Sequence, residues 1–147
     1  MHIKTINTKQ EISCLLQKHN DDFVPSLLER VKDFDAYAEK LNTNAVNITA
    51  VGPDGRIMGF ISFYSNDKTG KIAYCTILVT EKESRKAGVG CFLLKAFEEV
   101  SKNNGMEYLK LSTNIYNKPA ICLYMKNGYE ISEFIDDDKI YMRKKIN

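Results

Sequence analysis

The chain has 147 residues, the length of one domain, and a composition of 44% hydrophobic and 27% charged residues excludes a disordered or low-complexity protein. A chain of this size buries about 70% of the surface of its unfolded form, so it can hold a core without disulfides or metal. A formal charge of +2 argues against a nucleic-acid-binding protein.

The first forty residues show the apolar periodicity of helices. Residues 8–19 begin with Thr8, which can cap a helix, and a second periodic stretch covers residues 25–41. We therefore expect helices to precede the sheet.

From residue 45 the apolar residues follow the pattern of strands. Three such segments are 45–51, 57–64 and 72–80, and the third is apolar enough for a central strand. The Asp54-Gly55 pair marks a hairpin turn between the first two segments. These segments predict an antiparallel meander.

The second half of the chain alternates helices and strands. Residues 88–103 carry an apolar stripe at helical spacing, and residues 107–113 alternate as a strand does. A short helix is expected after Asn117, which can serve as its N-cap. Two closing strands are expected over about 129–135 and 139–145.

The order of these elements is typical of a single domain over residues 1–147. Helices come first, then the meander, then strand, helix, strand, helix, strand and strand. This order predicts the α/β (α+β) class, with a mixed, mainly antiparallel central sheet flanked by helices.

The cysteines and histidines do not have the spacing of metal ligands. No two of the four cysteines form a CxxC pair, and both histidines lie within the first twenty residues. We expect no metal site and reduced thiols. The polar start of the chain does not resemble a signal peptide, and no segment is apolar enough to span a membrane, so a cytoplasmic protein without a membrane partner is expected.

One connector has the composition of a phosphate-binding loop. It leads from the strand ending at Val79 into the helix through Arg85, Lys86, Gly88 and Gly90. The first N–H groups of a helix have no intrahelical partner and attract anions, and glycine removes the Cβ atoms that would keep an anion away. The alternative is that the glycines serve a tight turn and the cations are simply solvated.

Two other glycine-loop motifs do not fit this connector. A Walker loop needs a Lys followed by Ser or Thr after its last glycine, and neither glycine here is followed by that Lys. A dinucleotide-binding fingerprint needs a third glycine, where this chain has Leu93, and needs its glycines directly after the strand.

A second group of residues surrounds the short helix after the strand over 107–113. Tyr124 lies seven residues beyond Asn117, close to two helical turns, so both lie on the same side of the helix. A tyrosine stays protonated at neutral pH and can donate a proton to a leaving group. A capped helix with a Tyr at the core edge is the alternative.

Together the two segments resemble the GCN5-related N-acetyltransferase (GNAT) family. The family pattern Arg/Gln-x-x-Gly-x-Gly/Ala is present at residues 85–90, and the pattern Asn-x-x-Ala-x-x-Leu-Tyr-x-x-x-Gly-Phe/Tyr is present at residues 117–129. The resemblance covers about residues 72–130 and implies a GNAT-like fold with acetyl-coenzyme A as the acetyl donor.

The resemblance also implies roles for particular residues. Tyr124 would protonate the departing thiolate, and the N–H of Val79 would polarise the acetyl carbonyl. Asn117 would contact the pantetheine arm. The residues implied to bind the coenzyme are Ile77, Leu78 and Val79 on the strand edge, Arg85, Lys86, Ala87, Gly88, Val89 and Gly90 in the loop, and Asn117.

Two features depart from the family pattern. The connector after Val79 is one residue longer than in many members, so the register of the arm-binding strand could shift by one. Some members also carry a glutamate base where this chain has Ser112. The base is therefore open among Glu81, Glu83, Tyr74 and solvent.

The acceptor is expected to be a primary amine of a small molecule. A protein or peptide amine is an alternative, as is a non-catalytic acyl-coenzyme A-binding module. Acidic residues could attract a cationic amine, although charged helix faces are usually only solvated, and three tyrosines could shape a pocket. These residues are Asp21, Asp22, Glu29, Asp33, Asp35 and Glu39, and Tyr37, Tyr64 and Tyr116. The closing strands could pair across a homodimer.

Overall fold

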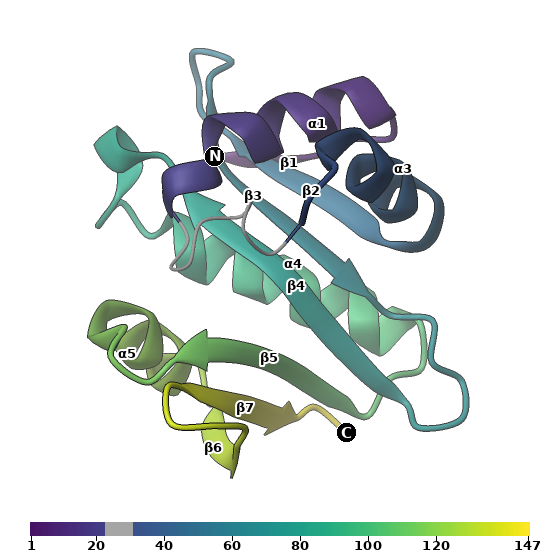
Figure 1. Cartoon of the computed structure of the whole chain (residues 1–147), viewed down its shortest axis with the longest axis vertical. Coiled ribbons are helices and arrows are strands. Elements are labelled where there is room, and N and C mark those ends of the chain that lie inside the picture. Colours follow the sequence, from purple (N-terminus) through teal and green to yellow (C-terminus); the bar gives the residue numbers. More distant parts are fainter. Residues whose placement is uncertain (23–30) are drawn as a thin grey trace.

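A mixed seven-stranded sheet forms the centre of the molecule in the computed structural model, which describes residues 1–22 and 31–147 (Figure 1). Within these residues the strand order is β1-β2-β3-β4-β5-β7-β6, and only β4 and β5 run parallel. The predicted fold class and sheet type are confirmed. The strands are β1 (His2–Thr5), β2 (Val46–Val51), β3 (Ile57–Tyr64), β4 (Ile72–Thr80), β5 (Tyr108–Asn114), β6 (Glu130–Phe134) and β7 (Lys139–Lys145).

The N-terminal strand β1 corrects the expectation of helix throughout the first forty residues. It pairs antiparallel with β2, from His2 opposite Val51 to Thr5 opposite Ile48. Four residues with one apolar side chain are too few to show alternation, so no strand pattern is visible in the sequence. The edge of β2 supplies the hydrogen-bonding partners that make this segment a strand.

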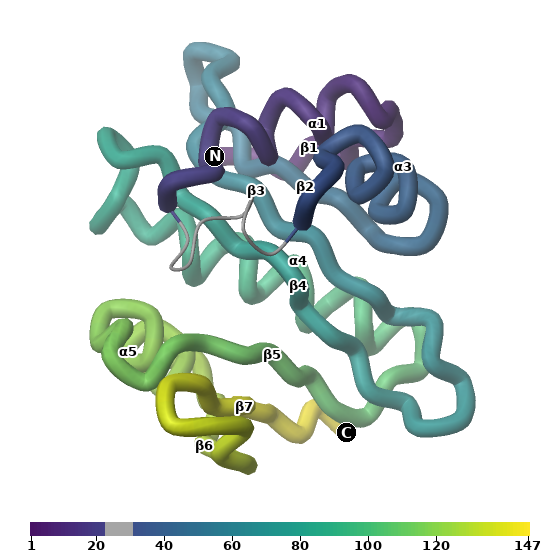
Figure 2. The backbone as a smooth tube through the Cα atoms, viewed as in Figure 1, coloured from purple at the N-terminus to yellow at the C-terminus, as the bar shows by residue number. Residues whose placement is uncertain are grey.

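Helices cover both faces of the sheet (Figures 1 and 2). Helices α1 (Lys9–Lys18) and α3 (Phe34–Asn44) pack on one face, against β3 and β4. Helices α4 (Val89–Asn103) and α5 (Lys118–Lys126) pack on the other. The first part of the second predicted helix falls on residues 23–30, outside the described residues, and its later part is α3.

Two of the helices begin at the caps that the sequence predicts. The Thr8 side chain accepts a hydrogen bond from the N–H of Glu11 at 3.2 Å, and the Asn117 side chain accepts one from the N–H of Ala120 at 3.3 Å. Each such cap contributes about 1 kcal/mol of stability. Because α5 starts directly after β5, its cap also fixes where Asn117 lies relative to the sheet.

The core beneath α4 and α5 buries a thiol and two phenols, and this predicts a loss of stability in alkali. Burial raises the pKa of Cys75 from 9.0 to about 12, and it also raises the pKa values of Tyr124 and Tyr129. Each group has a higher pKa in the folded than in the unfolded state. The stability that it contributes is therefore complete below the unfolded-state pKa and lost as pH rises toward the folded-state pKa.

We expect the free energy of unfolding in urea to be flat from about pH 6 to 8 and to fall by roughly 5 kcal/mol by about pH 11. Cys75→Ala should make the fall shallower, because it removes one of the three groups. An alkaline profile that is identical in this variant would contradict the assignment of the thiol.

Candidate active site

The central strands β4 and β5 pair along only part of their length. Their parallel ladder ends at Cys75 opposite Leu111, whereas β3 follows β4 as far as Thr80 and β7 follows β5 as far as Asn114. Figure 2 shows β4 and β5 separating beyond this point. The last five residues of β4 thus have a free edge, without a strand partner among the described residues on that side, and its backbone groups can bind an extended ligand.

A β-bulge at Thr76 switches which side chains of β4 face each side of the sheet, at the same point. Two adjacent β3 residues stand opposite Cys75 and Ile77, so Thr76 is the extra residue. As a result, Cys75 packs beneath α4, whereas Ile77 and Val79 pack beneath α1 and α3. The bulge fixes which face of the sheet each residue from Ile77 to Val79 occupies.

The three residues predicted to contact the pantetheine arm all lie on this free edge. Ile77 and Val79 are buried against α1 and α3, and Leu78 packs partly against the core beneath α4. The Cys75 thiol donates to the carbonyl oxygen of Ile77 at 3.4 Å.

The loop before α4 leaves the start of that helix accessible. Lys86 and Gly88 have left-handed backbone conformations, with φ of 70° and 80°. Gly88 is the N-cap and makes no side-chain hydrogen bond to the helix, so the first-turn N–H groups have no intrahelical partner. A Cβ atom at Gly88 would meet no atom within 4 Å. The space in front of these donors is therefore open.

Gly90 has a different role from Gly88. A Cβ atom there would lie 2.8 Å from Cδ2 of Leu123, so this glycine allows α5 to pack closely against α4. The interpretation that both glycines clear space for an anion therefore holds geometrically only for Gly88. The Val89 side chain is buried, so Val89 would contact an anion through its backbone N–H.

Arg85 reaches back to the N-terminal part of the chain. Its Nη2 lies 3.6 Å from Oδ1 of Asp22, at the end of the 3₁₀ turn η1 (Asn20–Asp22). Oδ2 of Asp22 lies 2.6 Å from Nδ1 of the buried His19. The Arg85 side chain is 52% exposed, and an exposed ion pair contributes roughly 0 to 1 kcal/mol. Arg85 can therefore exchange this partner for a phosphate at little cost.

Tyr124 is buried in the core beneath α4, near the point where β4 and β5 separate. Burial is the main cause of its raised pKa, and the nearby Cys75 adds to it. The Tyr124 ring also packs near Tyr129, with centroids 6.0 Å apart. Its phenol therefore stays protonated at neutral pH and can act as an acid. Asn117 is exposed at the start of the same helix.

The three side chains considered as the base lie in different surroundings. Glu81 is buried, with Oε1 2.5 Å from Nζ of Lys18 and 3.4 Å from Nε2 of His19. Glu83 is exposed in the turn η2 (Lys82–Ser84). The Tyr74 hydroxyl lies 3.1 Å from Oγ of Ser112. Because Tyr74 lies next to the last paired residues of β4 and β5, it is the one of the three placed at the separation.

Most of the described acidic residues proposed for acceptor binding already have partners. Asp33 caps α3 and Asp35 accepts from Ser13 at 3.2 Å, while Asp22 pairs with His19 and Arg85. Asp21 accepts from Asn20, Glu39 is exposed, and Glu29 lies outside the described residues.

Two of the three predicted pocket tyrosines meet near the bulge. The Tyr37 hydroxyl lies 3.1 Å from Oγ1 of Thr76. Burial, and to a smaller extent the nearby Tyr37, raises the pKa of Tyr64. Tyr116 is 75% exposed and contributes to no enclosed pocket among the described residues. Lys110 and Tyr141, which approach the separation on the same face as Tyr74, were not considered from the sequence because the β5–β7 pairing is not visible there.

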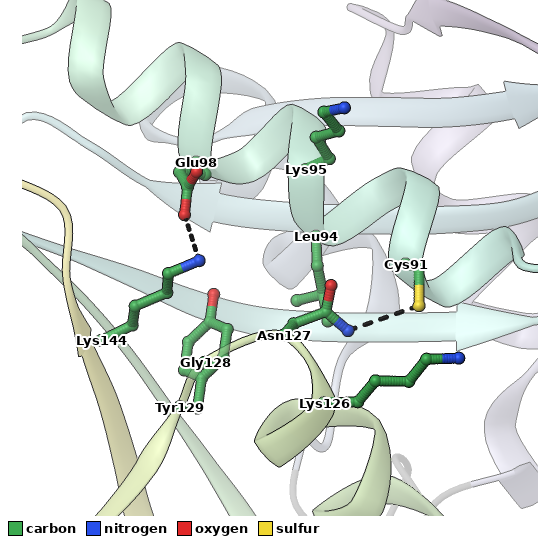
Figure 3. Close-up of a pocket in the computed structure, with 9 residues that line it drawn as sticks. All are labelled: Cys91, Leu94, Lys95, Glu98, Lys126, Asn127, Gly128, Tyr129 and Lys144. Atoms are coloured by element: carbon green, nitrogen blue, oxygen red, sulfur yellow. Dashed lines mark hydrogen bonds and ion pairs between the residues drawn. The ribbon is translucent and has the colours of Figure 1, made fainter.

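A cavity of about 530 Å³ lies elsewhere, between the middle of α4, the end of α5 and β7 (Figure 3). Its polar groups bond one another: Nζ of Lys144 lies 2.6 Å from Oε1 of Glu98, and the Asn127 amide donates to Sγ of Cys91 at 3.4 Å. The free edge of β4 does not line it. This cavity is therefore separate from the candidate site.

The remaining features of the described residues concern metal ligands, thiols and membrane spans. They contain no group of three or more His, Cys, Asp or Glu side chains placed to hold a metal ion. The cysteines are free, with Cys75 buried, Cys91 half-buried, and Cys14 and Cys122 exposed. None of the helices in the described part is long and apolar enough to cross a membrane.

The model of the acetyltransferase (GNAT) family matches residues 13–129. The chain is 29% identical over 116 residues to the UPF0157 protein YqkA of Bacillus subtilis (strain 168), a match covering 78% of this chain and 30% of that protein. It is 32% identical over 80 residues to the uncharacterized N-acetyltransferase YhfO of the same organism, covering 52% and 54%. The chain thus spans 30% and 54% of these relatives.

Among solved structures, the fold is similar to that of an aminoglycoside 6'-N-acetyltransferase complexed with coenzyme A. The TM-score is 0.77 and the identity 19%, over 100% of this chain and 98% of that one. At this identity the likeness concerns the fold.

Proposed function

Because the chain belongs to the acetyltransferase (GNAT) family, we propose that it transfers an acetyl group from acetyl-coenzyme A to a primary amine of a small molecule. One observation carries this proposal: the free edge of β4, the open start of α4 and the protonated Tyr124 surround the same separation of two strands. A thioester carrier needs these three features together, namely an extended binding edge, an anion site and an acid for the sulfur.

The coenzyme fits the residues present. The N–H groups from Lys86 to Gly90 and the Arg85 side chain would hold its pyrophosphate, and the edge from Ile77 to Val79 would pair with its pantetheine arm. Asn117 would contact the arm further along. When bound, the coenzyme supplies an acetyl thioester.

Tyr124 and Val79 would have separate roles in the reaction. The acceptor nitrogen forms a bond to the acetyl carbon, and the bond from that carbon to sulfur breaks. The N–H of Val79 would stabilise the negative charge that develops on the carbonyl oxygen, and Tyr124 would donate its proton to the departing sulfur. The proton lost by the amine restores Tyr124 by way of solvent, so charge and protons balance.

The Tyr74–Ser112 pair is our choice for the hydroxyl groups that relay the amine's proton through water to solvent. Both hydroxyls lie next to the last paired residues of β4 and β5, whereas Glu81 is already paired with Lys18. An acceptor that arrives as a neutral amine needs only solvent for this step.

A thiol-release assay tests the proposal. Purified protein and acetyl-coenzyme A are mixed with polyamines, amino sugars, aminoglycosides, amino acids and peptides, and free thiol is measured together with acetylated product. Release with a small amine supports the proposal, and release with peptides alone would favour the protein-amine alternative. Coenzyme binding by calorimetry without release from any amine would refute catalysis and favour a binding module.

A further inference from the structure

One face of β5, β7 and β6 is not covered by any described helix (Figure 1). Leu109 and Leu111 of β5 and Ile140 and Met142 of β7 point into the core beneath α4 and α5. The alternate residues of both strands therefore point to the opposite face. An acceptor can reach the separation of β4 and β5 from this open face.

Four side chains form a connected cluster on the open face beside the separation. Tyr74 contacts Ser112 at 3.1 Å, and Ser112 is paired with Tyr141 in the β5–β7 register. The Tyr74 and Tyr141 rings meet edge to face with centroids 6.3 Å apart. Nζ of Lys110 lies 3.9 Å from the centroid of the Tyr141 ring. The Lys110 ammonium is thus held over the ring of the residue that stands opposite Ser112.

A second cation lies directly opposite Lys110. Arg143 is its partner in the β5–β7 register and lies over the Tyr108 ring, 4.0 Å from the ring centroid. Like charges opposite one another destabilise a sheet, and within residues 1–22 and 31–147 neither cation forms an ion pair with a carboxylate. Both line a cavity of about 200 Å³ on this face. An anion bound beside Lys110 and Arg143 would offset the repulsion between the two cations.

Two acidic residues also lie on the open face. Glu133 lines the same cavity and Glu130 stands opposite Arg143, but both belong to β6. Because β7 lies between β6 and β5 and strands are about 4.8 Å apart, the backbone of these two residues lies roughly 10 Å further from β4 than the backbone of Lys110 does. The residue opposite Tyr74 in the β4–β5 register is thus a cation, Lys110.

We propose that the acceptor is an amine that also carries an anionic group, which Lys110 and Arg143 bind. This inference rests on the proposed function and narrows its substrate class. Lys110 and Ser112 are two residues apart on one strand, about 7 Å along the backbone, so the acceptor would need a spacer of several atoms between its amine and its anionic group. The class includes linear amino acids and amino-alkyl phosphates, and it excludes polyamines as preferred acceptors.

Three probes that share a primary amine and a five-carbon chain test the remote charge: 5-aminopentanoate, 5-aminopentanamide and 1,5-diaminopentane, whose kcat/KM is halved to allow for its two equivalent amines. We expect kcat/KM for the acid to exceed that for the diamine by about tenfold at low salt, and the difference to shrink at about 0.5 M salt. Lys110→Gln should nearly remove the preference, and Lys110→Glu should reverse it. The KM for acetyl-coenzyme A should be unchanged in both variants. A fourth probe, 4-aminobutylphosphonate, distinguishes phosphate-like from carboxylate acceptors.

Lys95→Gln and Lys95→Glu are matched controls, because they make the same charge changes at an exposed position on the other face. They should leave the order of the probes as in the wild type. Two outcomes would overturn the inference while leaving the proposed function standing. One is a kcat/KM that does not depend on the remote charge of the probe. The other is that the Lys110 variants behave like the Lys95 controls. Absence of release with every amine would instead overturn both.

Discussion

Tyr124→Phe is expected to lower kcat by a factor of about 10² to 10⁴, the usual contribution of a general acid. The change removes one hydroxyl and keeps the ring that packs beneath α4. The coenzyme KM should therefore stay within about twofold of the wild-type value. The measurement is steady-state thiol release with a saturating amine, together with coenzyme affinity from calorimetry.

Tyr129→Phe is the matched control for this variant. Tyr129 contacts the Tyr124 ring, and its buried hydroxyl has no hydrogen-bonding partner in the described structure. Removing that hydroxyl should keep turnover near wild type and leave stability unchanged or slightly higher, because an unsatisfied buried polar group costs free energy. Equal losses of turnover in the two variants would point to core packing rather than to proton donation.

Gly88→Val is expected to weaken acetyl-coenzyme A binding by at least about tenfold to a hundredfold, or ~1.4 to 2.8 kcal/mol. The new side chain would fill the open space before the first-turn N–H groups of α4. Valine at a φ of 80° is also strained, so a loss of stability of roughly 1 to 3 kcal/mol should accompany it. Isothermal titration calorimetry and urea unfolding measure the two effects separately.

Gly105→Val separates strain from binding. Gly105 has a φ of 82°, no atom within 4 Å of its Cβ position, and lies just beyond the opposite end of α4. It should lose similar stability with unchanged coenzyme affinity. If Gly88→Val binds the coenzyme as the wild type does, the loop is not the pyrophosphate site.

Much of the fold could be predicted because the signals are local. The strands over 57–64, 72–80 and 139–145 have the predicted bounds, and α4 begins one residue later than predicted. The Thr8 and Asn117 caps depend on residues three positions away. The strand β1 was missed because its cause is the edge of β2, which is distant in the sequence.

The candidate site likewise combines local motifs, which the sequence indicates, with tertiary contacts, which it does not. The Arg85–Gly90 motif and the α5 cap are contiguous segments, so the sequence indicates both, but it does not reveal that Gly90 faces Leu123 while Gly88 faces open space. Nor does it show that Glu81 is paired with Lys18, which removes it from the residues free to act as a base.

The amino-acid sequence by itself determined most of the helices and strands, where two helices are capped and which loop is the candidate anion site, because each depends on a few neighbouring residues. The tertiary structure decided where β4 and β5 separate, that Thr76 forms a bulge, and that Tyr74 meets Ser112 across 38 positions of sequence. It also placed Lys110 opposite Arg143. Such contacts depend on the register between strands, and register is set by packing of the whole sheet rather than by any one strand.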